Sequence, residues 1–185
     1  MTGRWSSRIV LTALVALATG CGGRDGDSAG PEPAAPATIA LTSPAFTDGG
    51  SLPRRYTCDG EGQAPPLAWS GVTANARELA LVVTDIDAPS GAFVHWVVIA
   101  LDPRSTGIPA GTKPATLRQG KGSSEKVGYE PPCPPQGSPP HRYVFTLYAL
   151  RSPLGLPDGA STKDVRAAIV SRAVARGRLT ARYAR

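Results

Sequence analysis

Two short segments of the sequence carry side chains whose types and spacing suit ligand chemistry. Residues 85–89 (Asp-Ile-Asp-Ala-Pro) place two carboxylates and a proline after an apolar run, and His95 stands at the start of the next run. Further along, His141 and Tyr143 open a third apolar run behind a proline-rich segment. Residues two apart in an extended strand point to the same face, so this imidazole and phenol would project together, as Phe93 and His95 would.

These groups favour the binding of an oxyanion. Imidazole N–H and phenol O–H groups donate hydrogen bonds to phosphate oxygens, and a histidine gains a proton readily beside an anion. Asp85 is expected to hold His95 in one tautomer, although its charge also repels an anion. We therefore expect weak binding that strengthens as the pH falls through the range in which histidine titrates. Taken singly, the same residues also fit a solvated hairpin tip, a surface His141 and a core Tyr143.

An enzyme and a metal protein are weaker interpretations of these residues. Asp85 and His95 could act as an acid–base pair, but the sequence offers no nucleophile in a suitable turn. The Gly-x-Ser-x-Gly match at residues 26–30 lacks the strand and helix that this motif requires. A zinc set of His95, His141, Cys58 and Cys133 lacks short ligand spacing. We expect no catalysis, no cofactor and no metal.

The elements that must position these residues are mainly strands. Leu79, Leu81 and Val83 alternate on one face before the Asp-x-Asp turn, and residues 94, 96 and 98 are expected to do so after it. Residues 142–150 are mostly apolar at both odd and even positions, which is typical of a central strand covered on both faces.

The remaining composition favours a β-rich fold with one helix. The chain has 21 Gly and 19 Pro, which favour turns and short strands. A helix capped by Ser161 or Thr162 is expected to carry its apolar stripe as far as Ala173 and to end at Gly177, before a last strand at 178–183. We predict an antiparallel β-sandwich with one helix in the C-terminal region.

The N-terminus has the pattern of an export signal. Residues 1–20 combine Arg4 and Arg8 with an apolar stretch too short to span a bilayer. The sequence Ala-Thr-Gly-Cys that ends at Cys21 resembles a bacterial lipobox, and that resemblance implies a lipidated Cys21. A plain secretory signal that leaves Cys21 free is the alternative. Residues 21–37 predict a flexible tether, and 38–185 the folded domain.

Charge gives little support to a nucleic-acid partner. The formal net charge is +6, and it would be +4 without Arg4 and Arg8. This mild excess suits a protein beside an anionic lipid surface. Arginines gather near the C-terminus, at Arg172, Arg176, Arg178, Arg182 and Arg185. They are more typical of a solvated face.

Seven short motifs in order resemble the phosphatidylethanolamine-binding protein family, in its bacterial Raf-kinase-inhibitor-like branch. They are Cys58-Asp59-Gly60, Pro65-Pro66-Leu67-x-Trp69, Asp85-x-Asp87-Ala88-Pro89, His95-Trp96, Gly128-Tyr129, Pro132-Cys133-Pro134-Pro135-x-Gly137 and His141-Arg142-Tyr143. The resemblance covers residues 39–184 and implies an antiparallel β-sandwich with a small anion pocket at one end. It implies that this pocket is lined by Asp85, His95, Pro134, Pro135, His141 and Tyr143, with Asp87, Ala88, Phe93 and Cys133 beside them. Ile86, Pro131 and the loop 120–127 depart from the family pattern, so the pocket rim is expected to differ.

The cysteine count bears on the same region. If Cys21 is lipidated, Cys58 and Cys133 remain as an even pair in an oxidising compartment. A disulfide between them would close a long loop and add roughly 4 kcal/mol of stability. Two reduced thiols are the alternative.

These inferences lead to one expected function and one alternative. We expect an exported, membrane-anchored lipoprotein, on the outer side of the cytoplasmic membrane or in the cell envelope. It would bind small phosphate-bearing ligands or phospholipid head groups without catalysis. The alternative is a protein-inhibitor module that acts on an envelope protease or another protein partner.

Overall fold

The computed structural model describes residues 1–2, 33–112 and 114–185. The expected signal peptide, the lipobox and Cys21 lie outside the described residues. Among the described residues, no helix has both the length and the apolar character needed to cross a membrane.

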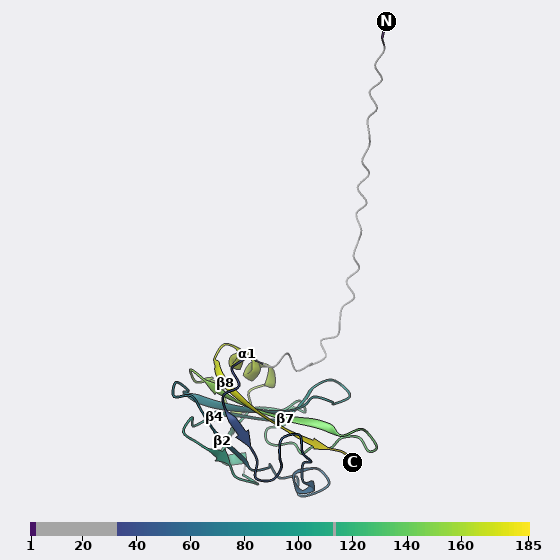
Figure 1. Ribbon diagram of the computed structural model, residues 1–185, viewed down its shortest axis with the longest axis vertical. Coiled ribbons are helices and arrows are strands. Elements are labelled where there is room, and N and C mark those ends of the chain that lie inside the picture. The colour runs from purple at the N-terminus through teal and green to yellow at the C-terminus, as the bar shows by residue number, and fades with distance from the viewer. Residues whose placement is uncertain (3–32, 113) are drawn as a thin grey trace.

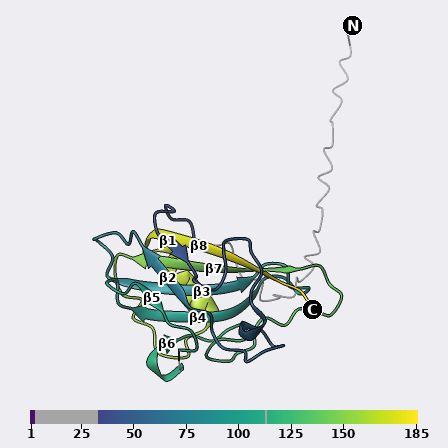
Figure 2. The ribbon, with the colours of Figure 1, turned by 60° about the horizontal axis from the view of Figure 1, so that its bottom comes forward.

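Two antiparallel sheets form the domain (Figures 1 and 2). The larger sheet has the order β6-β4-β3-β7-β8. Its strands are β3 (Glu78–Asp85), β4 (Phe93–Leu101), β6 (Arg118–Gln119), β7 (His141–Leu150) and β8 (Ala173–Tyr183). The smaller sheet has the order β1-β2-β5, with β1 (Ala40–Thr42), β2 (Leu67–Ser70) and β5 (Gly107–Ile108). Two short 3-10 turns, η1 (Arg54–Tyr56) and η2 (Pro114–Thr116), lie in the connections.

The main core lies between the two sheets, and a second core lies under the single α-helix. Trp69 of β2 belongs to the same buried cluster as Trp96 of β4 and Phe145 of β7. On the other face of the larger sheet, Val165 and Ile169 of α1 (Thr162–Val170) pack with Val82 and other apolar residues. The predicted mainly β, antiparallel sandwich with one helix is confirmed. Both faces of the larger sheet are covered, which explains why all eight residues of β3 are buried.

A β-bulge in β4 changes the predicted alternation of that strand. Val83 pairs with Trp96 and Thr84 pairs with Val94, so one step along β3 spans two steps along β4. His95 is the extra residue. Val94 consequently packs in the core under the helix while Trp96 packs between the sheets, and the prediction that both share a face is wrong. Bulges commonly re-aim a side chain beside a functional site.

The helix ends earlier than the sequence pattern predicts. It stops at Val170, and Ala173 already begins β8, which pairs with β7 along its whole length. Gly177 therefore lies within a strand and does not end the helix. At this position a Cβ atom would come within 2.5 Å of the Ile39 carbonyl oxygen, so the glycine permits the chain before β1 to cross β8 closely.

Candidate functional site

Three ring side chains, those of His95, His141 and Tyr143, meet at one end of the larger sheet, where β4, β3 and β7 lie side by side. The ring centroids of His95 and Tyr143 are 5.3 Å apart, and those of His141 and Tyr143 are 6.5 Å apart. The ring centroids of Phe93 and His95 are 4.8 Å apart. All but Phe93 are buried, as is Asp85, which is 4% exposed. We call Asp85, His95, His141 and Tyr143 the His–Tyr cluster.

Strand register explains why residues so distant in sequence meet here. Asp85 is the last residue of β3, and its Cα partners are Phe93 on one side and Tyr143 on the other. His141 is two residues before Tyr143 and so shares its face of β7. The bulge then turns His95 toward the same face, where its ring contacts Tyr143.

The hydrogen bonds of the two imidazoles differ from the sequence prediction. Asp85 Oδ2 lies 2.7 Å from Nδ1 of His141, and Asp85 Oδ1 accepts a hydrogen bond from the Asp87 backbone N–H. Nδ1 of His95 instead lies 2.9 Å from the Glu130 carbonyl oxygen. The prediction that Asp85 orients His95 is therefore wrong, because the strand pairing of β3 with β7 places His141, and not His95, at the Asp85 carboxylate.

The Glu130 carbonyl and burial together define the state of His95. A carbonyl oxygen only accepts, so Nδ1 of His95 carries the proton and Nε2 is left with a lone pair when the ring is neutral. Burial lowers the pKa of His95 below its ordinary value, against the opposing effects of the Glu130 carbonyl and the Asp85 charge. His95 is therefore a neutral imidazole at neutral pH, and it gains a proton only at lower pH or beside an anion.

Tyr143 carries a buried polar atom without a partner. Tyr143 is fully buried, and its hydroxyl has no hydrogen-bond partner among the described residues. Burial first, then the charge of Asp85 and then the approach of the Asp85 carboxylate to the hydroxyl raise the pKa of Tyr143, although that approach does not have the geometry of a hydrogen bond; the group therefore remains a protonated O–H donor. A buried hydroxyl without a partner costs about 1–3 kcal/mol, and such a group in a native structure calls for an explanation.

A second tyrosine hydroxyl behind the cluster is also unpaired. Tyr56, on η1, is fully buried and its hydroxyl lacks a partner in the described part of the chain. Tyr129 donates a hydrogen bond to the Tyr56 carbonyl. Burial raises the pKa of Tyr129, and the phenols of Tyr143 and Tyr56 add to that effect. Tyr56 stands in no motif with chemistry of its own, so the sequence gives no signal that it lies near a site.

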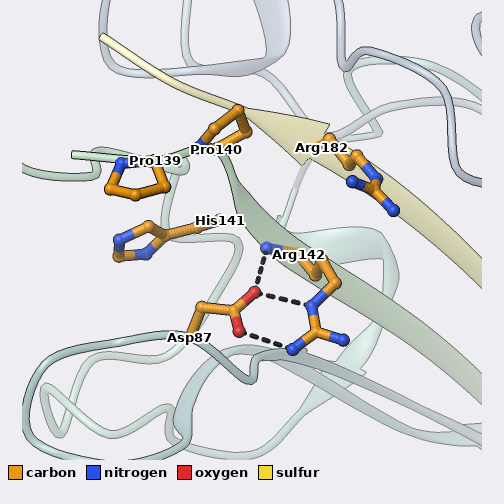
Figure 3. Close-up of a pocket in the computed structure, with 6 residues that line it drawn as sticks. All are labelled: Asp87, Pro139, Pro140, His141, Arg142 and Arg182. Atoms are coloured by element: carbon orange, nitrogen blue, oxygen red, sulfur yellow. Dashed lines mark hydrogen bonds and ion pairs between the residues drawn. The ribbon is translucent and has the colours of Figure 1, made fainter. Parts of the chain in front are cut away.

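An open pocket of about 310 Å³ lies beside the cluster, on the outer face of the sheet (Figure 3). It is lined by Asp87, Pro139, Pro140, His141, Arg142 and Arg182, and we call it the outer pocket. Asp87 accepts three hydrogen bonds from Arg142, two from the guanidinium and one from the backbone N–H. The side-chain hydrogen bonds from Arg142 lower the pKa of Asp87 more than any other contact. Asp87 therefore belongs to this outer face rather than to the His–Tyr cluster.

The remaining residues of the expected pocket wall lie around these two sites. Ala88 is half-buried in the turn after β3, and its carbonyl accepts a hydrogen bond from Gly91 N–H. Pro134 is buried, whereas Pro135 is exposed. The prolines that line the outer pocket are Pro139 and Pro140, which the sequence analysis did not assign to a site.

A disulfide ties the loop before β7 to the loop after η1. It joins Cys58 and Cys133, whose Cα atoms are 5.4 Å apart, and both residues are exposed. Asp59 beside it accepts hydrogen bonds from Tyr183 and Arg185. These contacts join the C-terminus to the same end of the sheet that carries the His–Tyr cluster.

The described residues hold no group of three or more His, Cys, Asp or Glu side chains arranged to bind a metal ion. In the zinc set considered above, two members, Cys58 and Cys133, are joined to each other.

Comparisons with known proteins agree with the fold. A family model described as phosphatidylethanolamine-binding protein matches residues 42–184. A UPF0098 protein of Methanothermobacter thermautotrophicus is 45% identical over 150 residues, which cover 78% of this chain and 98% of that protein. A Mycobacterium tuberculosis protein described as a candidate lipoprotein, LppC, is 42% identical over 187 residues and 92% of each chain. The crystal structure of CT736 from Chlamydia trachomatis, described as a candidate homologue of the same family, has a TM-score of 0.75 at 34% identity and covers 80% of this chain and 98% of its own.

Proposed function

The chain belongs to the phosphatidylethanolamine-binding protein family, and from this premise we propose that it binds small phosphate-bearing ligands at the His–Tyr cluster without chemical conversion. The observation that carries the proposal is the Tyr143 hydroxyl. It is buried, remains protonated, lies beside two imidazoles and has no partner among the described residues. A ligand oxygen at this point would remove the cost of the unpaired donor.

The two imidazoles suit a ligand that either carries a proton itself or causes an imidazole to take one up. Nδ1 of each ring is engaged, by Glu130 at His95 and by Asp85 at His141, which leaves both Nε2 atoms for a ligand. Nε2 of neutral His95 accepts a hydrogen bond, so it can receive one from a protonated phosphate, or it can become a donor by gaining a proton itself. Either route makes binding stronger at lower pH, in line with the expectation from the sequence.

The Asp85 carboxylate opposes an anion less than its charge alone suggests. Both of its oxygens already accept hydrogen bonds, from Asp87 N–H and from His141 Nδ1. Its negative charge is thus partly offset by donors on the protein. Asp85 in this proposal positions His141, and the ligand meets His95, His141 and Tyr143.

Isothermal titration of the purified full chain tests the proposal. Inorganic phosphate and phosphorylethanolamine are titrated at about pH 6 and about pH 8, on either side of the ordinary histidine pKa. Affinity should be higher at the lower pH and should fall in Tyr143→Phe. A phosphodiester, glycerophosphorylethanolamine, separates the two proton routes, because it has no proton to lose in this range. Absence of heat with all three ligands at both pH values would exclude the cluster as an anion site.

We further propose that the chain is a lipoprotein of the cell envelope. The Ala-Thr-Gly-Cys sequence at residues 18–21 and the 42% identity with a protein described as a candidate lipoprotein support this. Metabolic labelling with a fatty-acid analogue should mark the wild-type protein and leave Cys21→Ser unlabelled. Equal labelling of both would show that Cys21 is not the modified residue.

A further inference from the structure

We propose that the outer pocket is a second anion site, which takes a phosphate group between Arg142 and Arg182. Arg142 points away from the face of β7 that carries Tyr143, and the proposal holds even if the His–Tyr cluster binds nothing. The chemistry is recognition of a phosphate oxyanion by guanidinium groups, whether the phosphate is free in solution or part of a lipid head group.

An imbalance of charge at the ends of β7 and β8 supports this site. Arg142 and Arg182 are Cα partners across these strands, so both side chains leave the same face of the sheet. Like charges directly opposite each other destabilise a strand pair. Asp87 neutralises Arg142 through both of its carboxylate oxygens. Within the described part of the chain, the Arg182 side chain has no hydrogen bond or ion pair, and one positive charge at the pocket remains without a counter-charge.

The shape of the pocket matches a small oxyanion with a short substituent. Its volume of about 310 Å³ is at the lower end of the range for small-molecule sites. Pro139 and Pro140 form a wall that has no backbone N–H to offer. The donors available to a ligand are therefore those of the two guanidinium groups. A guanidinium fork binds two phosphate oxygens at once, which makes arginine better suited to this role than lysine.

The carboxylate in the lining does not prevent anion binding. Asp87 accepts three hydrogen bonds from Arg142, so it acts as an internal counter-ion of that residue. Arg142 keeps one guanidinium nitrogen free of this pair in Figure 3, and Arg182 keeps its whole guanidinium group. With two arginines and one aspartate, the lining carries a net charge of +1 before any contribution from His141.

The place where the N-terminal segment joins the domain bears on whether the phosphate could belong to a lipid head group. Ala37 bridges to Arg176, so the segment that precedes the domain joins it along β8, the strand that carries Arg182. Lipidation of Cys21, as proposed above, would keep the whole domain within the reach of the tether from a membrane. Soluble phosphate and an anionic lipid must accordingly be tested separately.

Nuclear magnetic resonance on the ¹⁵N-labelled full chain tests the site. Inorganic phosphate is titrated at constant ionic strength, and the Arg Nε–H signals and the amides of Asp87, Arg142 and Arg182 are followed. Arg182→Gln should weaken the response at these signals about tenfold, the loss expected when a charge-assisted contact is removed. Arg178→Gln is the matched control, because it removes the same charge from the same face of the same strand. It should keep the wild-type affinity within about twofold.

Vesicle flotation separates the two sources of phosphate. Phosphatidylcholine vesicles with and without phosphatidylglycerol are compared for wild type, Arg182→Gln and Arg178→Gln. Selective loss of phosphatidylglycerol-dependent binding in Arg182→Gln identifies a lipid head group, and a response to inorganic phosphate alone identifies a soluble ligand. Equal losses in Arg182→Gln and Arg178→Gln would mean diffuse attraction to a basic face and would overturn the proposal. So would an absence of any response to phosphate and to anionic vesicles.

Discussion

Replacement of Tyr143 by phenylalanine should change stability and binding in opposite directions. Tyr143 is fully buried, and its hydroxyl finds no hydrogen-bond partner among the described residues. Phenylalanine keeps the ring, which packs against His95 with centroids 5.3 Å apart, and removes only the oxygen. The variant therefore loses the unpaired donor without opening a large cavity.

The magnitudes follow from that single atom. A buried hydroxyl without a partner costs about 1–3 kcal/mol, so the free energy of unfolding of the free protein should rise by about 1 kcal/mol or more. For a domain of this size, that corresponds to an increase in Tm of about 3 °C. In the complex the same hydroxyl donates to a charged oxygen, a contact of about 1.5–3 kcal/mol, so phosphate affinity should fall roughly 10- to 100-fold.

Thermal unfolding by circular dichroism and calorimetric titration with phosphate measure the two effects on the same samples. Tyr148→Phe is the control, because Tyr148 is buried on the opposite face of the same strand, in the core under the helix. It should leave phosphate affinity unchanged. If Tyr143→Phe lowers Tm, the hydroxyl is satisfied in the free protein and the reasoning fails. If affinity is unchanged, the hydroxyl does not meet the ligand.

Three further predictions concern pH, the disulfide and one glycine. Burial lowers the pKa of His95, so the unfolded state takes up a proton first as the pH falls below about 6.5. The free energy of unfolding should be at its full value above that pH and decline as the pH drops through the folded pKa, and urea titrations should show a smaller decline in His95→Gln. The disulfide closes a loop with a sequence separation of 75, so replacing both Cys58 and Cys133 by serine should cost about 4 kcal/mol in denaturant titrations, and a loss below about 1 kcal/mol would contradict the loop-closure reasoning. Gly177→Ala should cost about 1–3 kcal/mol in the same assay, because the new Cβ would come within 2.5 Å of the Ile39 carbonyl, and an unchanged midpoint would show that the crossing chain yields easily.

Much of the larger sheet could be predicted because buried strands have a recognisable pattern of apolar residues in the sequence. β3 and β7 are apolar on both parities, and both lie in the interior of the larger sheet, where α1 covers one face and the smaller sheet the other. The helix cap was also readable, since Ser161 accepts a hydrogen bond from Asp164 N–H. These features depend on local periodicity and on side-chain chemistry within a few residues.

The errors occur where a contact distant in sequence decides the outcome. Ala173 continues the apolar stripe of the helix, yet it belongs to β8 because it pairs with Leu150 of β7. A glycine at position 177 is typical of a helix end, but in the structure a glycine is needed there because the Ile39 backbone lies too close for a Cβ atom. His95 becomes a bulged residue only through its pairing with β3. No window of sequence around these positions contains the partner strand.

The same dependence on register explains the arrangement of charges at both sites. Asp85 and Asp87 are two residues apart, and the two side chains that they bind, His141 and Arg142, are adjacent on β7 and so point to opposite faces. Asp85 closes β3 and stays in the sheet, where it bonds to His141 on the inner face. Asp87 lies beyond the strand, and the turn carries it to Arg142 on the outer face.

One Asp-x-Asp motif thus supplies a carboxylate to each face of the sheet, and His141 is the residue on which both sites meet. Its Nδ1 atom bonds to Asp85 in the His–Tyr cluster, and its ring lines the outer pocket. A ligand in either site that moves this ring changes what the other site offers to an anion. Coupling between the two sites must therefore pass through His141. Tyr143 and Arg182, which lie on opposite faces of the sheet, can be altered separately to reveal it.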